Sequence, residues 1–151
     1  MSDIFKRRIM FSNFPNDGEI RFTIHLDKIK KVFILEDDEK RKEYFKEVFK
    51  DKELVMTDNV EYALRVVGAR KFDLILLDHD LDGKVFVDST VERTGCEVAM
   101  ELKNTMNIET FCIIHSMNPT GAANMVKAHP FNTCYIPFFM LKEAFKTKEA
   151  T

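Results

Sequence analysis

Short apolar runs alternate with amphipathic segments along the chain from about residue 31 onward. The run Phe72–Leu77 is almost wholly apolar, which is typical of a strand buried on both faces of a sheet. Further strands are expected at Lys31–Leu35, Leu54–Met56, Thr110–Ile114 and Thr133–Ile136. Helices are expected at Glu39–Lys50, from a cap at Thr57 or Asp58 to Val67, from a cap at Thr94 to Lys103, at Gly121–Ala128 and at Phe139–Lys148. This alternation predicts an α/β fold, a three-layer, doubly wound sandwich around a five-stranded parallel sheet.

The first thirty residues follow a different pattern. Ile9–Phe14 and Ile20–Leu26 alternate apolar with polar side chains, and Pro15-Asn16-Asp17-Gly18 separates them. Asp-Gly between two alternating runs is a strong signal for a β-hairpin. We therefore expect residues 1–30 to form a hairpin extension and residues 31–151 to form the main domain. We prefer a ribbon that covers a sheet edge or joins subunits to a flap that clamps a substrate.

Polar clusters directly follow three of the predicted strands. Their sequences are Glu36-Asp37-Asp38, Asp78-His79-Asp80 and His115-Ser116-Met117-Asn118. The carboxyl ends of neighbouring parallel strands lie at one edge of a sheet, about 4.8 Å apart, so these clusters are predicted to meet in one acidic pocket. Grouped carboxylates repel one another unless a cation lies between them, and oxygen ligands suit Mg²⁺ or Mn²⁺. The sequence therefore predicts a site for a divalent metal at this edge of the sheet.

Composition narrows the class of protein. The chain has 151 residues, enough for one domain, and 45% of them are apolar, which suffices for a core. The net charge of −2 argues against a general nucleic-acid binder. Its 3 cysteines lack a Cys-x-x-Cys spacing, so buried thiols in a reducing compartment are expected. Because no apolar stretch approaches the roughly 20 residues that span a bilayer, we expect a cytoplasmic protein without a membrane partner.

The βα pattern with an acidic pair after strand one and Asp78 after strand three resembles the receiver domain of response regulators. The resemblance covers about residues 31–148 and implies the strand order 2-1-3-4-5. It places the metal-binding and phosphoryl-accepting roles of that family on Asp37, Asp38 and Asp78. Two positions depart from the receiver pattern. His115 stands where receivers have Ser or Thr, and Ile136, ahead of Pro137, stands where they have Lys.

Four stretches resemble a divergent branch more closely, the cyclic-phosphate-processing receiver-like family. They are LEDDEKR, LDHDL, RTGCEVA and HSMNPTGAANM, in this order along the chain. The resemblance implies activity on a cyclic phosphate, either at an RNA end or on a small cyclic nucleotide. The protein is then a metal-dependent phosphoesterase.

That chemistry needs groups that move protons and groups that hold a phosphate. Histidine titrates near neutrality, so His79 and His115 are candidate general acid and base beside Asp78. Asp80 could bind the metal or orient His79. The candidate phosphate ligands are Ser116, Asn118, the helix N-terminus at Gly121, and Arg41, for which a surface ion pair is an equal alternative. Asp38 could instead be a helix cap, and we expect Asp58 to be one. His25 and His129 fall outside the predicted pocket.

A second class of function stays open at this stage. In it the domain is a non-enzymatic receiver-like module, whose acidic pocket binds metal or a small phosphorylated ligand as a switch. A purely structural module would leave the pocket idle. Near the last strand, Phe131, Phe138 and Phe139 could form a partner-binding face. The resemblance to receivers, which dimerise through this face, implies that a homodimer is possible.

Overall fold

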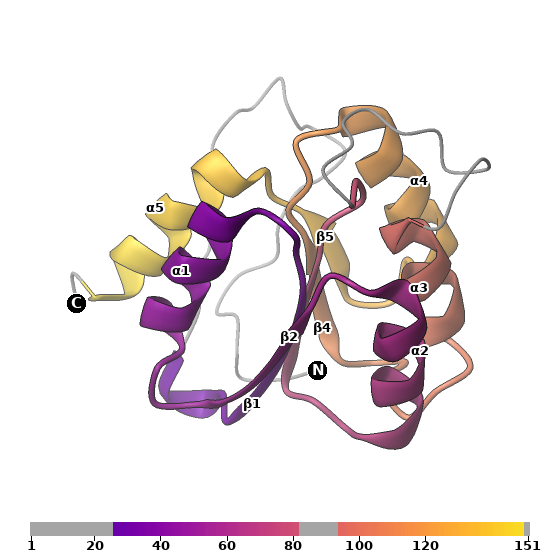
Figure 1. The fold of residues 1–151 in the computed structure, drawn as a ribbon, viewed down its shortest axis with the longest axis horizontal. Coiled ribbons are helices and arrows are strands. Elements are labelled where there is room, and N and C mark those ends of the chain that lie inside the picture. The colour runs from indigo at the N-terminus through magenta and orange to yellow at the C-terminus, as the bar shows by residue number, and fades with distance from the viewer. Residues whose placement is uncertain (1–25, 82–93, 150–151) are drawn as a thin grey trace.

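The computed structural model describes residues 26–81 and 94–149, apart from the side chains at 143–144 and 146–149. A parallel sheet of five strands runs through its centre in the order β2-β1-β3-β4-β5. Helices α1 and α5 cover one face of the sheet, and α2, α3 and α4 cover the other (Figure 1). The predicted three-layer α/β fold and its strand order are therefore confirmed.

The elements lie close to the ranges that the sequence predicts. The strands are β1 (Lys31–Leu35), β2 (Glu53–Thr57), β3 (Leu74–Leu77), β4 (Phe111–Ile114) and β5 (Thr133–Tyr135). The helices are α1 (Glu39–Val48), α2 (Val60–Ala69), α3 (Gly95–Leu102), α4 (Pro119–Ala128) and α5 (Phe138–Glu149).

The sheet separates two apolar cores. Side chains alternate between the faces of a strand, so Ile34 and Leu76 point toward α1 and α5, whereas Leu35 and Leu77 point toward α2, α3 and α4. All four are fully buried. This alternation matters for function because it also decides the face on which each residue after a strand lies.

Polar side chains begin the helices as hydrogen-bond acceptors for otherwise unpaired amides. Thr94 caps α3, as predicted, and Asp38 caps α1, the alternative to its predicted role as a metal ligand; they accept from the amides of Cys96 and Arg41. The prediction that Asp58 caps α2 is wrong, because the side chain of Asn59 accepts from the amide of Tyr62 at 2.7 Å. Thr57, the alternative, instead accepts from the amide of Asn59.

The start of α4 also differs from the prediction. The helix begins at Pro119 rather than at Gly121, and Asn118 is its cap. Proline suits the first position of a helix because its fixed φ matches the helix and its missing N–H would lack a partner there. Gly121 therefore lies inside the first turn.

Most of the predicted N-terminal hairpin lies outside the described residues. Leu26, its last predicted strand residue, starts a 3₁₀ helix that spans Leu26–Lys28. Within the described ranges, no helix combines the length and the apolar character needed to cross a membrane.

Candidate functional site

Three polar residues occupy equivalent places at the end of neighbouring strands. Glu36, Asp78 and His115 each come directly after β1, β3 and β4, whose last residues are in register. The backbone ladder continues through this row, since the amide of Asp78 donates to Leu35 and the amide of His115 donates to Leu77, both at 3.0 Å. The three residues therefore lie side by side across the sheet. We call Glu36, Asp78 and His115 the strand-end row.

All three side chains of the strand-end row are buried, with the backbone alternation placing them on the face covered by α1 and α5. The ring of Phe45, from α1, packs edge-on against His115 with centroids 5.2 Å apart. Ile136 follows β5 at the fourth position of the row and is apolar and buried. The row thus has an apolar wall on two sides.

Glu36 and His115 form a direct pair inside this row. Nε2 of His115 lies 2.7 Å from Oε1 of Glu36, and neither side chain is exposed. Nδ1 of His115 is also buried and has no hydrogen-bond partner within the described part of the chain. A histidine held at one nitrogen by a carboxylate presents its other nitrogen in a fixed direction, which suits proton transfer or metal binding.

Glu36 is well satisfied as an acceptor despite its burial. Its Oε2 accepts from the amides of Asp37 at 3.1 Å and Asp38 at 2.9 Å. Burial by itself raises the pKa of Glu36, but the hydrogen bond and charge of His115, the amide of Asp38 and the charge of Arg41 outweigh it. The net result is a lowered pKa, so Glu36 is a carboxylate at neutral pH.

The pKa of Asp78 shifts in the opposite direction to that of Glu36. Burial, with the nearby charge of Glu36, raises the pKa of Asp78 to about 6, although His115, Arg41 and the amide of His79 oppose the shift. That amide donates to Oδ1 of Asp78 at 2.8 Å. A buried carboxylate whose ionisation is this costly gains from a cation placed beside it.

The strand-end row is also the candidate metal centre of the described residues. Glu36, Asp78 and His115 each offer one potential ligand atom, and these atoms all lie within 4.8 Å of one another. Asp37 is half-buried beside them, whereas Asp38 is exposed and its Oδ1 caps α1 by accepting from Arg41 at 2.9 Å. Of the predicted ligands, Asp78 belongs to this group, and Asp37 is adjacent in sequence to Glu36.

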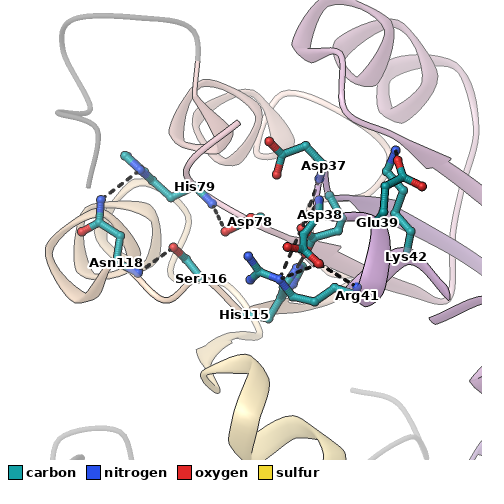
Figure 2. Close-up of polar contacts among 11 residues, drawn as sticks. Asp37, Asp38, Glu39, Arg41, Lys42, Asp78, His79, His115, Ser116 and Asn118 are labelled. Atoms are coloured by element: carbon teal, nitrogen blue, oxygen red, sulfur yellow. Dashed lines mark hydrogen bonds and ion pairs between the residues drawn. The ribbon is translucent and has the colours of Figure 1, made fainter. Parts of the chain in front are cut away.

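His79 belongs to a second cluster, which lies toward α4 and not with the strand-end row. Its Nδ1 lies 2.7 Å from Oδ1 of Asp80, and Nδ2 of Asn118 donates to the same oxygen at 3.1 Å. In Figure 2 the ring of His79 turns toward Asn118, whereas His115 lies beside Arg41. The sequence predicts that both histidines enter one pocket, but the structure distributes them between two clusters.

Gly121 packs directly against the imidazole of His79. A Cβ at Gly121 would lie 2.5 Å from Cγ of that ring, so only glycine allows this approach between α4 and the loop after β3. The amide of Gly121 donates to Oδ1 of Asn118 at 3.0 Å. Its predicted role as a phosphate-binding amide therefore competes with the helix cap.

Ser116 and Asn118 also form hydrogen bonds within the loop before α4. The amide of Asn118 donates to Oγ of Ser116 at 3.0 Å, and both residues are buried. The side-chain Nδ2 of Asn118 donates to Asp80 and its Oδ1 accepts from the amide of Gly121, so Asn118 joins Asp80 to the start of α4. The geometry supports a positioning role for Asn118, which holds Asp80 against His79.

Glu36 is the residue of the site that the sequence analysis left out of its candidates. The signal was present, because Glu36 immediately follows an apolar run, as Asp78 and His115 do. Taking the first residue after each strand as the equivalent one would have selected these three together. The receiver pattern of an Asp pair favours Asp37 and Asp38 instead.

Comparison with known proteins identifies the family of the chain. The model of a family described as the cyclic-phosphate processing receiver domain matches residues 31–129. None of the curated proteins matches the chain.

Solved structures with the same fold come from response-regulator systems. The receiver domain of a sensor histidine kinase from Pseudomonas aeruginosa PAO1, with magnesium in its active-site cleft, is 14% identical with a TM-score of 0.58, and the match covers 81% of this chain and 98% of that one. The Mn²⁺-bound form of response regulator Rcp1 is 23% identical with a TM-score of 0.57, covering 80% and 90%. TrrA from Thermotoga maritima, in complex with Mg²⁺ and BeF, is 22% identical with a TM-score of 0.57, covering 80% and 99%.

Proposed function

The chain belongs to the family of cyclic-phosphate processing receiver domains, and from this premise we propose that it is a metal-dependent phosphoesterase that opens a cyclic phosphate. The observation that carries the proposal is the buried Glu36–His115 pair beside Asp78 in the strand-end row. A receiver that only accepts a phosphoryl group on Asp78 has no need of a carboxylate-held imidazole next to it. Hydrolysis does need one, because protons must move to and from oxygen.

The residues fit a divalent metal. Receivers with the same fold have been solved with Mg²⁺ and with Mn²⁺. Here Asp78 is buried with a raised pKa, which a cation beside it would relieve, and acidic side chains at 36 and 37 lie at the end of the neighbouring strand. In this proposal Asp78 and Asp37 hold the ion, with Glu36 committed mainly to His115. Bound there, the ion supplies charge neutralisation at the phosphate and acidifies a water molecule.

His115 carries the proton transfers in this proposal. Nε2 donates to Glu36, so Nδ1 is the nitrogen that takes a proton from the attacking water as its oxygen bonds to phosphorus. The ester bond between phosphorus and one ring oxygen breaks, and the imidazolium returns its proton to that leaving oxygen. Glu36 stabilises the imidazolium and fixes its orientation. The product is an acyclic phosphate monoester.

His79 supports this site from the second cluster. Its backbone amide donates to Asp78, and its ring is held by Asp80 and packed on Gly121. The proposal therefore gives His79 and Asp80 a positioning role in place of the acid–base and metal-binding roles predicted from the sequence. The ligand class is a small cyclic phosphate or a cyclic phosphate at an RNA end.

The test is hydrolysis of nucleoside 2′,3′-cyclic phosphates followed by ³¹P NMR with Mg²⁺ or Mn²⁺. Asp78→Asn and His115→Gln are each expected to remove turnover, whereas Asp58→Asn, at an exposed carboxylate, serves as the matched control. Ring opening that survives both substitutions would refute the proposed site. Metal and nucleotide binding without any turnover would favour the non-enzymatic binding module.

A further inference from the structure

Among residues 26–81 and 94–149, the cation that reaches the strand-end row is Arg41, which comes from helix α1. Ile136, at the fourth position of the row, is buried among apolar side chains and brings no charge. Arg41 instead approaches the row from the first turn of α1, where its amide donates to the cap Asp38 at 2.9 Å. The charge of Arg41 acts on the pKa of both Glu36 and Asp78.

The guanidinium of Arg41 lacks a full set of hydrogen-bond acceptors. Its Nε lies 3.6 Å from Oε2 of Glu36 and 3.9 Å from Oδ1 of Asp38, and both distances exceed those of ordinary hydrogen bonds. Nη1 is buried and no acceptor for it exists in the ranges that the structure describes. A buried N–H of a charged group without an acceptor is unfavourable unless a ligand completes it.

An aromatic ring holds this guanidinium in place. Cζ of Arg41 lies 5.6 Å from the centroid of Phe138, the first residue of α5, and Phe138 packs edge-on against Phe45. Phe45 in turn contacts His115. Packing against Phe138 therefore orients the guanidinium, because its Nε makes no short hydrogen bond with a carboxylate. Figure 2 shows Arg41 beside His115.

We propose that Arg41 is the phosphate-binding cation of this site. A guanidinium presents parallel N–H groups that match two oxygens of a phosphoryl group, and the unpaired Nη1 gives it the capacity to do so. The inference rests on the proposed function, because it names the residue that binds the phosphate of that substrate.

The experiment measures binding, so that it is independent of turnover. Adenosine 2′,3′-cyclic phosphate and inorganic phosphate are titrated by calorimetry, in the presence of Mg²⁺, into the wild-type protein, Arg41→Gln and Arg41→Lys. Loss of a charge-assisted hydrogen bond predicts binding weaker by about 10-fold to 100-fold for Arg41→Gln. Arg41→Lys keeps the positive charge but loses the paired N–H donors of the guanidinium. Its phosphate affinity is expected to lie between those of the wild-type protein and Arg41→Gln.

Lys46→Gln is the matched control, since Lys46 lies on the same helix and pairs with Glu43 at 3.5 Å on the surface. Its phosphate affinity should stay within about twofold of wild type, as expected for a surface pair. Equal affinities for the wild-type protein and Arg41→Gln, or equal losses in Arg41→Gln and Lys46→Gln, would overturn the inference. So would a wild-type protein that binds neither phosphate.

A measurement on the wild-type protein removes any dependence on the folding of a variant. The ¹⁵Nε resonance of Arg41 should shift when either phosphate is added, and an unchanged resonance at saturation would contradict direct contact. Beryllofluoride, which mimics a phosphoryl group on Asp78, distinguishes the source of the anion. A shift with cyclic phosphate places Arg41 on the substrate, and a shift with beryllofluoride alone places it on a phosphorylated Asp78. Failure of hydrolysis with an intact shift would refute the enzyme and leave this inference standing.

Discussion

Nε2 of His115 lies 2.7 Å from Oε1 of Glu36, although the two residues are 79 positions apart in the sequence and neither side chain is exposed. An ionised carboxylate has no proton to donate, so Nε2 of the imidazole must carry the proton of this hydrogen bond. The second oxygen of Glu36 is occupied by two backbone amides. The loop after β1 therefore fixes Glu36, and Glu36 fixes the tautomer of His115.

Replacing Glu36 with Gln should reverse that tautomer. The side-chain oxygen of Gln would stay on the two amides, so its NH₂ group would face His115 and require Nε2 to accept. Imidazole ¹⁵N chemical shifts at pH 8 should then show Nε2–H in the wild-type protein and Nδ1–H in Glu36→Gln. Glu39→Gln, at an exposed carboxylate, should leave the shifts of His115 unchanged. Identical tautomers in the wild-type protein and Glu36→Gln would contradict the assigned roles.

Asp78→Asn should stabilise the metal-free protein at neutral pH. The pKa of Asp78 is raised from 3.8 to about 6, so the folded state holds its proton more tightly than the unfolded state. Stability from this group is present below pH 3.8 and is lost as the pH rises through about 6. Removing the charge should therefore gain about 1–3 kcal/mol at pH 7 in urea unfolding.

The same variant separates a metal site from an idle acidic cluster. Mg²⁺ or Mn²⁺ should raise the melting temperature of the wild-type protein, because the ion binds the folded state, and should have little effect on Asp78→Asn. If Asp78→Asn is less stable than the wild-type protein at pH 7 and equally responsive to metal, Asp78 is neither strained nor a ligand.

Gly121→Ala should destabilise the protein by about 1–3 kcal/mol, the usual cost of forcing extra volume into a packed contact. The added Cβ would meet the His79 ring at 2.5 Å, and α4 or the ring must move. Gly68 provides the comparison, since it is an exposed helical glycine with no atom within 4 Å of a Cβ placed there. Gly68→Ala should gain about 0.5–1 kcal/mol. Equal effects of the two substitutions, measured by urea unfolding, would show that the contact with His79 is not restrictive.

His129 should make the fold sensitive to mild acid. Burial, with the charge of Lys103, lowers the pKa of His129 from its usual 6.5, although a backbone contact with Ile108 opposes the shift. The unfolded state therefore takes up a proton first, and stability that is present above pH 6.5 is lost as the pH falls through the lowered pKa of the folded state. His129→Phe should lose less stability between pH 7 and pH 5. Unchanged pH dependence of unfolding in that variant would rule His129 out.

The sequence was sufficient for the parts of this protein that depend on local pattern. The continuous apolar run before Asp78 identified a central strand, and Thr94 identified the start of α3. Four motifs identified the family, which the match over residues 31–129 confirms. The prediction that Asp58 caps α2 was wrong because Asn59, one residue later, has a side chain of equal length that accepts the same kind of hydrogen bond. The preference of a residue type for the cap position does not distinguish two such neighbours. The packing of α2 determines which of them is the cap.

The folded structure determines which polar residues share a site. The sequence predicts that acidic and histidine side chains gather at the carboxyl ends of neighbouring strands, because parallel strands bring those ends to one edge. It did not determine that Glu36 joins Asp78 and His115 while His79 joins Asp80 and Asn118. Side chains one residue apart point to opposite faces of a sheet, so a shift of one position in the register moves a residue from one cluster to the other. That register is a property of strand pairing and helix packing, and it appears only when the chain has folded.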